Sequence, residues 1–142
     1  SFLQAKRFIY ADIQRQIDSA KFGKDAGNFL CAVGLLCYTE FAGGLKRGRF
    51  ARDEAARNFN EFFDDLGYRY RNFRTNCNVY DIFRCGLAHE YYVKKDCTIA
   101  MIHASKRIGI GKKISGEYYF IVEKYFKDFK RAFDRLGKIL YP

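Results

Sequence analysis

The chain has no tryptophan, one proline, one methionine and two histidines among its 142 residues. A single proline leaves long stretches without the strongest helix breaker, and this favours helices. The longest apolar run, Phe29 to Tyr38, is too short to span a bilayer, and the opening residues lack a signal-peptide pattern. We therefore expect a cytoplasmic protein with no membrane partner. A start at Ser1 rather than Met is typical of a processed chain or of a segment of a longer one.

Patterns that bind metals or cofactors are also absent from the sequence. The five cysteines contain no C-x-x-C pair and have no histidine at a ligand spacing; they are Cys31, Cys37, Cys77, Cys85 and Cys97. We interpret them as small buried apolar residues in a reducing cytosol, and we predict no metal and no cofactor. Residues 109–113, Gly-Ile-Gly-Lys-Lys, lack the length and the strand-to-helix setting of a phosphate-binding loop. A small-ligand or nucleotide-binding bundle is therefore the weakest of the functions considered.

Negative charge is scarce, because 26 Lys and Arg residues face only 16 Asp and Glu residues, for a net charge of +10. This excess favours a polyanionic partner, and nucleic acid before a membrane surface. Solubility is the simpler alternative explanation, because a net positive charge also supplies it.

Hydrophobic residues make up 49% of the chain and aromatic residues 18%, enough for a substantial core. Apolar residues recur at helical spacing, and the expected helices cover residues 2–22, 28–45, 53–66, 76 or 78 to about 92, and 118–140. Residues 98–103 and 107–110 resemble two short strands of a hairpin. The sequence therefore predicts one all-α domain over residues 1–142, an up-and-down bundle of about five helices with a small β-hairpin before the last helix.

The segment from Tyr68 to Arg74 alternates aromatic and basic residues. Rings between cations suit the stacking of bases and contact with phosphates. The same pattern fits a short linking turn whose rings tuck under the bundle. We favour the turn.

The most informative pair of residues is Arg84 and His89, in the fourth expected helix. A histidine can move a proton near neutral pH, and a guanidinium can hold the charge that develops on phosphate oxygens. Residues five apart on a straight α-helix differ by about 140° in direction, so the two side chains point to opposite flanks. A second copy of the helix, related by a two-fold axis, would bring an arginine and a histidine together.

This Arg-x4-His segment, in an all-α basic chain, resembles the HEPN superfamily. The family motif is an arginine, often followed by a polar residue, then four to six positions and a histidine. Arg84 and His89 match its two ends, and Cys85 occupies the position that is often polar. The resemblance implies a helical bundle, a homodimer and a composite site at the dimer cleft.

The resemblance also implies a metal-independent endoribonuclease of the toxin or defence-effector type, with RNA as substrate. His89 would take or relay the proton of a ribose 2′-hydroxyl that attacks the adjacent phosphate, and Arg84 would stabilise the charge on phosphorus. A toxin implies a possible antitoxin or regulatory protein as a further partner. The alternative is a non-catalytic HEPN-like module for RNA binding or protein assembly.

Other residues near the motif are candidates for supporting roles. Glu40 lies in an apolar helix, and we expect it to be half buried and paired with a cation such as Arg84. It either orients that guanidinium or is an interhelical ion pair only. Tyr91 is a further supporting residue, and Tyr92, Lys94 and Lys95 place a ring and two cations where they would guide RNA. The lysines equally suit a solvated helix end.

Structural explanations of the motif remain open as well. If Arg84 has only a structural role, it would pair with one of three acidic residues: Asp81, Glu40 or Glu90. His89 fits a surface histidine or a core histidine that is hydrogen-bonded to a carbonyl. The second histidine, His103, has no partner at a recognisable spacing, and we assign it no role.

Overall fold

The computed structural model describes residues 1–22, 28–87, 97–101 and 108–142. Most of these residues are helical, as the sequence predicts. The elements, in chain order, are α1 (Phe2–Phe22), α2 (Asn28–Arg47), the 3₁₀ turn η1 (Arg52–Glu54), α3 (Ala55–Asp65), α4 (Tyr68–Asn76), the π-helix η2 (Tyr80–Cys85), β1 (Cys97–Ala100), β2 (Ile110–Lys112), β3 (Tyr118–Ile121) and α6 (Val122–Leu140).

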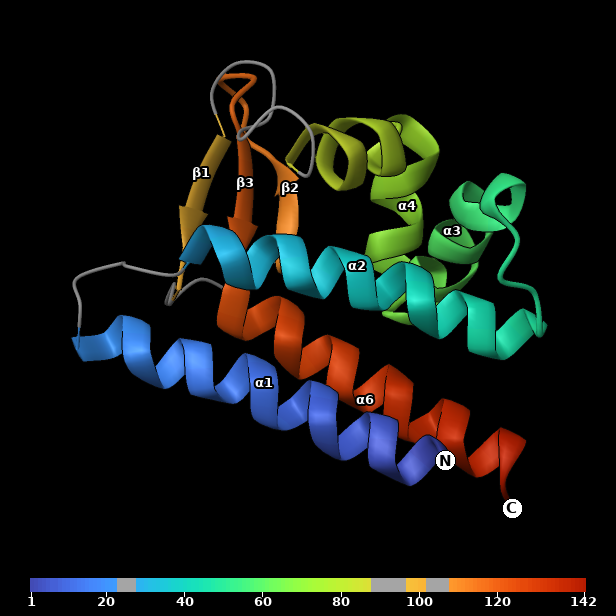
Figure 1. The fold of residues 1–142 in the computed structure, drawn as a ribbon. Helices are drawn as coiled ribbons and strands as arrows, with labels where there is room; N and C mark the ends of the chain where they lie inside the picture. Colours follow the sequence, from blue (N-terminus) through green and yellow to red (C-terminus); the bar gives the residue numbers. More distant parts are fainter. Residues whose placement is uncertain (23–27, 88–96, 102–107) are drawn as a thin grey trace.

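Three long helices form the body of the fold. α2 contacts α1, α3, α6 and η2, so it is the central helix. In Figure 1, α1 and α6 lie side by side below α2, while α3 and α4 lie toward the C-terminal end of α2. α2 and α6 run in the same direction and α1 runs opposite to both. The long helices therefore do not alternate as the expected up-and-down bundle would.

A three-stranded sheet stands at the other end of α2, and its strand order is β1-β3-β2 (Figure 1). β1 pairs with β3 in parallel, and β2 pairs with β3 antiparallel. Phe120 is the centre of the sheet, because Ile99 and Ile110 are its neighbours in the two registers. β3 continues directly into α6, so the sheet fixes where the last helix begins.

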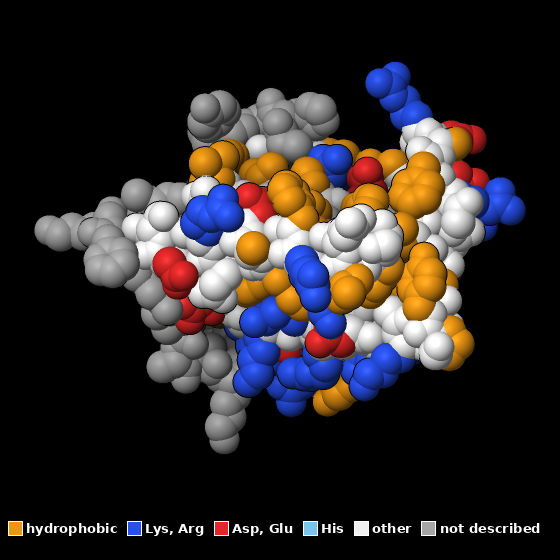
Figure 2. All heavy atoms as spheres, turned by 60° about the horizontal axis from the view of Figure 1, so that its bottom comes forward, with side chains coloured by type: hydrophobic (Ala, Val, Ile, Leu, Met, Phe, Trp, Pro, Cys, Tyr) orange, Lys and Arg blue, Asp and Glu red, His pale blue; other side chains and the backbone are white. Residues whose placement is uncertain are grey.

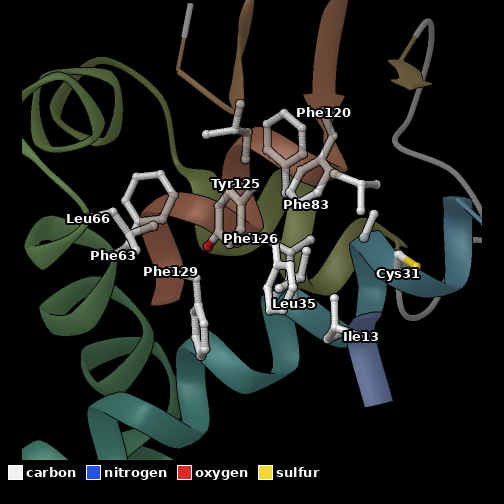
Figure 3. Close-up of a cluster of buried hydrophobic side chains, with 14 of the residues drawn as sticks. Ile13, Cys31, Leu35, Phe63, Leu66, Phe83, Phe120, Tyr125, Phe126 and Phe129 are labelled. Carbon is white, nitrogen blue, oxygen red and sulfur yellow. The ribbon is translucent and has the colours of Figure 1, made fainter. Parts of the chain in front are cut away.

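The core is largely aromatic (Figure 3). Phe62 of α3 meets Phe129 of α6 edge-on with ring centroids 5.4 Å apart, and Phe129 stacks on Phe133 at 5.5 Å. Such ring pairs add stability beyond the area that they bury. Gly109 allows close packing here, because a Cβ on it would lie 2.4 Å from the backbone nitrogen of Tyr125.

Two buried hydroxyl contacts tie the elements together inside this core. The hydroxyls of Thr39 and Tyr125 lie 2.7 Å apart, and Thr39 also donates to the carbonyl oxygen of Leu35 at 2.7 Å. Tyr70 of α4 donates to the carboxylate of Asp128 on α6 at 2.5 Å and accepts from the amide of Gly109 at 2.9 Å. Buried polar groups with partners of this kind carry little penalty.

Three local predictions were wrong. Residues 68–74 belong to a helix, α4, and not to a linking turn; Tyr70 is buried as expected, but Tyr68 is exposed. The two expected strands do not pair as a hairpin, because β3 lies between β1 and β2. The last helix begins at Val122, since the residues from Tyr118 to Ile121 form that middle strand.

Other predictions of local structure were confirmed. Gly67, with φ 146°, follows the end of α3 in a conformation that favours glycine. Asn78 caps the next helical segment, as its side-chain oxygen accepts the amide of Asp81 at 3.1 Å. All five cysteines are free, although only Cys31 is fully buried.

One helix, Phe29–Arg47, is long and apolar enough to cross a membrane when judged by length and composition alone. The central helix of a soluble protein meets the same criterion, and 44% of the most apolar window is buried within the fold. The expectation that the protein has no membrane partner stays untested.

Candidate functional site

The structure brings together two of the predicted site residues, Arg84 of η2 and Glu40 of α2. Arg84 Nε lies 3.2 Å from Glu40 Oε1, with about 20% of the arginine side chain and 25% of the glutamate side chain exposed. Of the two considered acidic partners that the structure describes, Asp81 and Glu40, Glu40 is the one that forms an ion pair with Arg84. Glu90 lies outside the described residues, as do His89, Tyr91, Tyr92, Lys94, Lys95 and His103.

Within the described residues, the contact of Arg84 with Glu40 involves the Nε atom of the guanidinium. Arg84 Nε and Glu40 Oε1 are buried, and their contact is electrostatic, because neither atom has a hydrogen-bond partner within the described part of the chain. The exposed surface of Arg84 must therefore lie on its other side-chain atoms. A guanidinium has five N–H donors, so a carboxylate beside Nε leaves the terminal nitrogens for an anion.

A π-helix carries Arg84 into this position. The amide of Gly86 donates to the carbonyl oxygen of Asp81, five residues earlier, so the turn is wider than an α-helical one. Single π-helical turns occur frequently at functional sites. The expected angle of about 140° between Arg84 and His89 stays a prediction, because His89 lies outside the described residues.

Packing explains why η2 is held firmly against the core. Val79, Phe83 and Leu87 are buried, as the expected apolar stripe of this segment predicts. The Phe83 ring meets Tyr118 of β3 edge-on, with centroids 5.4 Å apart, and Phe73 of α4 at 6.2 Å. Arg84, the residue after buried Phe83, reaches Glu40 on α2 from this firmly packed segment.

Three further titratable side chains surround the ion pair. Burial raises the pKa of the Cys37 thiol, Arg84 lowers it and Glu40 raises it again. Burial likewise raises the pKa of Tyr80, with further contributions from Cys85 and Glu40. A raised pKa keeps Cys37 and Tyr80 protonated at neutral pH.

The structure shows two further surfaces, of which sequence analysis missed the first. α2 points Leu30, Cys37 and Phe41 outward, and Leu30 is 64% exposed. Phe50, 62% exposed, lies over α2 because Gly44 has no side chain, and its ring centroid is 6.0 Å from that of Phe41. We call these residues the α2 apolar face. One feature of the sequence could have indicated this face: the helix has no charged residue from Phe29 to Thr39, so its solvent-facing side must be apolar there.

The second surface is the outward side of α6, which is basic along its whole length. In Figure 2, Lys and Arg side chains gather along one edge of the molecule, below a band of hydrophobic side chains. The basic residues were recognisable in the sequence as the outer side of the last helix, but nothing there indicated how they are held.

No group of three or more His, Cys, Asp or Glu residues in the described segments is arranged to hold a metal ion. Comparison with known proteins finds no matching family model, no similar curated protein and no similar solved structure. Function must therefore be argued from the residues themselves.

Proposed function

We propose that this protein is a metal-independent endoribonuclease of the HEPN type, with Arg84 and His89 as catalytic residues at a homodimer cleft. The observation that carries the proposal is the Glu40–Arg84 pair, which fixes one edge of a guanidinium at a partly exposed position. His89 lies five positions further along the chain from this guanidinium. A fixed cation stabilises a charged transition state better than a mobile one, because no reorganisation is needed during the reaction.

In the proposed reaction, a ribose 2′-hydroxyl attacks the adjacent phosphorus and the 5′-oxygen of the next nucleotide leaves. His89 takes or relays the proton of the attacking hydroxyl, and the terminal nitrogens of Arg84 hold the phosphate oxygens. The products are a 2′,3′-cyclic phosphate and a free 5′-hydroxyl. DNA is not a substrate, because it lacks the attacking hydroxyl. Glu40 acts through Arg84 as a positioning residue.

The second copy of the chain belongs on the α2 apolar face. Two chains that each carry a net charge of +10 repel one another, so they meet most easily where charge is absent. The face holds exposed Leu30, Phe41 and Phe50, and on its flank the charges of Glu40 and Arg84 offset each other. Since Arg84 and Glu40 both act on the pKa of Cys37, the face adjoins the ion pair. Large exposed apolar patches of this kind mark association surfaces.

The test is cleavage of an end-labelled RNA by the purified chain in phosphate-free buffer that contains EDTA. We expect products with cyclic phosphate ends, no cleavage of the same sequence as DNA, and at least about 100-fold slower cleavage by Arg84→Ala and by His89→Ala. Arg7→Ala is the matched control, because Arg7 is an exposed arginine of α1. Cleavage that persists in both Arg84→Ala and His89→Ala disproves the assignment.

The role of Glu40 is tested separately with Glu40→Gln, which keeps the shape and removes the charge. A positioning role predicts a lower kcat with an unchanged KM and an unchanged pH profile. An ion pair that serves packing alone predicts a lower Tm and an unchanged kcat.

The α2 apolar face also favours a second function, that of a non-catalytic module for assembly or RNA binding. A wild-type chain that binds RNA without cutting it, or that dimerises without binding RNA, would establish this alternative. An antitoxin or regulatory protein remains a proposed partner under either function, and so does a cytoplasmic location.

A further inference from the structure

The outward side of α6 is a continuous stripe of positive charge. Its cations follow one another at spacings of three, four, four and three residues, and we call them the α6 basic stripe: Lys124, Lys127, Arg131, Arg135 and Lys138. At 100° per residue they fall within an arc of about 80°, over a length of about 21 Å. All but Lys124 are exposed.

Two of the three acidic residues of α6, Asp128 and Asp134, do not interrupt this stripe, and the third, Glu123, precedes its first cation. Asp134 turns toward α1, where it binds Lys6 at 2.9 Å. Asp128 is only 3% exposed, and its carboxylate lies under the stripe. From there it contacts Lys124 Nζ at 3.2 Å and an Arg131 terminal nitrogen at 3.2 Å, while Tyr70 donates to it from α4.

Asp128 therefore fixes the positions of two cations from below and does not cover them. Arg135 is also held, since its guanidinium donates to the carbonyl oxygen of Asp65 at 2.8 Å. Long basic side chains normally lose entropy when they bind an anion. Three of the five cations have already lost part of that freedom in the folded protein.

The stripe carries a cost in stability. Four of its neighbouring pairs are like charges three or four residues apart, and each such pair destabilises a helix by a few tenths of a kcal/mol. Solubility alone is served as well by mixed charges. A row of cations that lowers stability, contains no negative charge and is partly immobilised is better explained by a polyanionic ligand than by solubility.

We propose that the α6 basic stripe binds the phosphate backbone of single-stranded RNA. Each cation that neutralises a phosphate releases condensed counterions, which makes such binding strong and salt-dependent. The convex surface of a helix contacts a backbone without reading bases, so the stripe recognises phosphodiesters and not a sequence. The choice of RNA over DNA rests on the function proposed above, whereas the phosphate contact does not.

The stripe is a capture surface and lies apart from the cleavage site. Arg84 is held by Glu40 of α2, whereas the stripe cations are held by Asp128 of α6 and Asp65 of α3, so the two groups belong to different clusters of contacts. Loss of the stripe should therefore raise the KM for a long RNA and leave kcat unchanged.

The experiment measures the affinity of the full chain for a labelled 20-nucleotide RNA by fluorescence anisotropy over a range of salt concentrations. All proteins carry His89→Ala, so that cleavage does not affect the readout. The stripe variant is Lys127→Glu/Arg135→Glu/Lys138→Glu, which spares the two cations on Asp128. The control is Arg7→Glu/Arg15→Glu/Arg52→Glu, three exposed arginines of α1 and η1 with the same change in net charge.

We expect the stripe variant to bind RNA at least about tenfold more weakly than the control. In a plot of log affinity against log salt concentration, the slope of the stripe variant should be smaller in magnitude than that of the control by about 2. Equal losses in both variants would overturn the proposal, because net charge alone would then explain binding. A DNA of the same sequence that binds more than about tenfold tighter than the RNA would overturn the choice of ligand.

Two further outcomes separate this inference from the function proposed above. If the wild type cuts no RNA but the stripe variant still loses affinity, the endoribonuclease proposal fails and the stripe proposal stands. If anionic phospholipid vesicles bind through the stripe while RNA affinity is unchanged, the stripe proposal fails. Circular dichroism and Tm confirm that both triple variants fold.

Discussion

α2 and α6 pack against each other through their buried sides, yet their outward sides are opposite in character. The outward side of α2 is apolar, and the charges of Glu40 and Arg84 on its flank offset each other. The outward side of α6 is a row of cations held from beneath by a buried carboxylate. The apolar side of α2 fits the second polypeptide that we propose there, and the cationic side of α6 fits the polyanion that we propose there.

The largest expected effect concerns the carboxylate beneath the basic stripe. Asp128→Ala removes the acceptor of Tyr70 and the counter-charge of Lys124 and Arg131. Breaking a buried charged network costs about 3 kcal/mol, so urea unfolding should show a loss of that size. Asp134→Ala, on the same helix but in a more exposed pair with Lys6, should cost about 1 kcal/mol or less. Equal losses would show that Asp128 has no special role.

The second prediction tests the apolar side of the comparison. Leu30→Glu should leave the free energy of unfolding nearly unchanged, because the side chain is 64% exposed. It should weaken dimerisation about 100-fold, because an unpaired charge would be buried between two copies. Sedimentation of the two proteins measures this, and Lys127→Glu on the basic stripe is the matched control. A wild type that is monomeric at assay concentrations contradicts the assignment of the α2 apolar face.

Alkaline pH probes the buried phenols that connect α6 to α4 and to α2. Burial, together with the negative charge of Asp128, raises the pKa of Tyr70. Burial likewise raises the pKa of Tyr125, and the hydrogen bond with Thr39 lowers that pKa by a smaller amount. A raised pKa in the folded state means that stability is complete below the unfolded pKa of about 10 and is lost as the pH rises above it.

The free energy of unfolding should therefore fall above about pH 10, by up to about 1.4 kcal/mol per pH unit for each phenol. Tyr125→Phe should make this fall less steep, while Tyr68→Phe, at an exposed position, should leave it as in the wild type. Unfolding measured by denaturant at a series of pH values checks the slope. Identical slopes in all three proteins would mean that the phenols do not control alkaline stability.

The same contrast explains which parts of the fold were predictable from sequence. α6 and α3 alternate apolar and charged residues at helical spacing, so their existence and their buried sides followed from the pattern. α2 is apolar on nearly every side, so the pattern predicted a helix but not which side faces solvent. The Glu40–Arg84 pair was predictable because a carboxylate in an apolar helix requires a cation.

The errors arose where distant contacts decide local structure. Residues 118–121 have the composition of either a strand or a helix start, and pairing with β1 and β2 on both sides makes them a strand. α4 has too few apolar residues for a helical pattern, and contacts of Tyr70 with Phe63 and Asp128 hold it as a helix. The wide turn of η2 has no sequence signature, although it determines where Arg84 points.

The smallest expected effect is the response of stability to salt. Repulsion within the α6 basic stripe is screened when ionic strength rises from about 0.05 M to about 0.5 M, because the Debye length falls well below the spacing of the outer cations. The free energy of unfolding of the wild type should therefore rise with salt. The Lys127→Glu/Arg135→Glu/Lys138→Glu variant should gain less, by about 0.5 kcal/mol, because three of its four neighbouring pairs are no longer like charges. The Arg7→Glu/Arg15→Glu/Arg52→Glu variant has the same net charge but retains the stripe, so it should keep more of the salt response. An equal response in the two triple variants would mean that the salt effect comes from the net charge of the whole molecule. Repulsion between the cations of α6 would then make no separate contribution to stability.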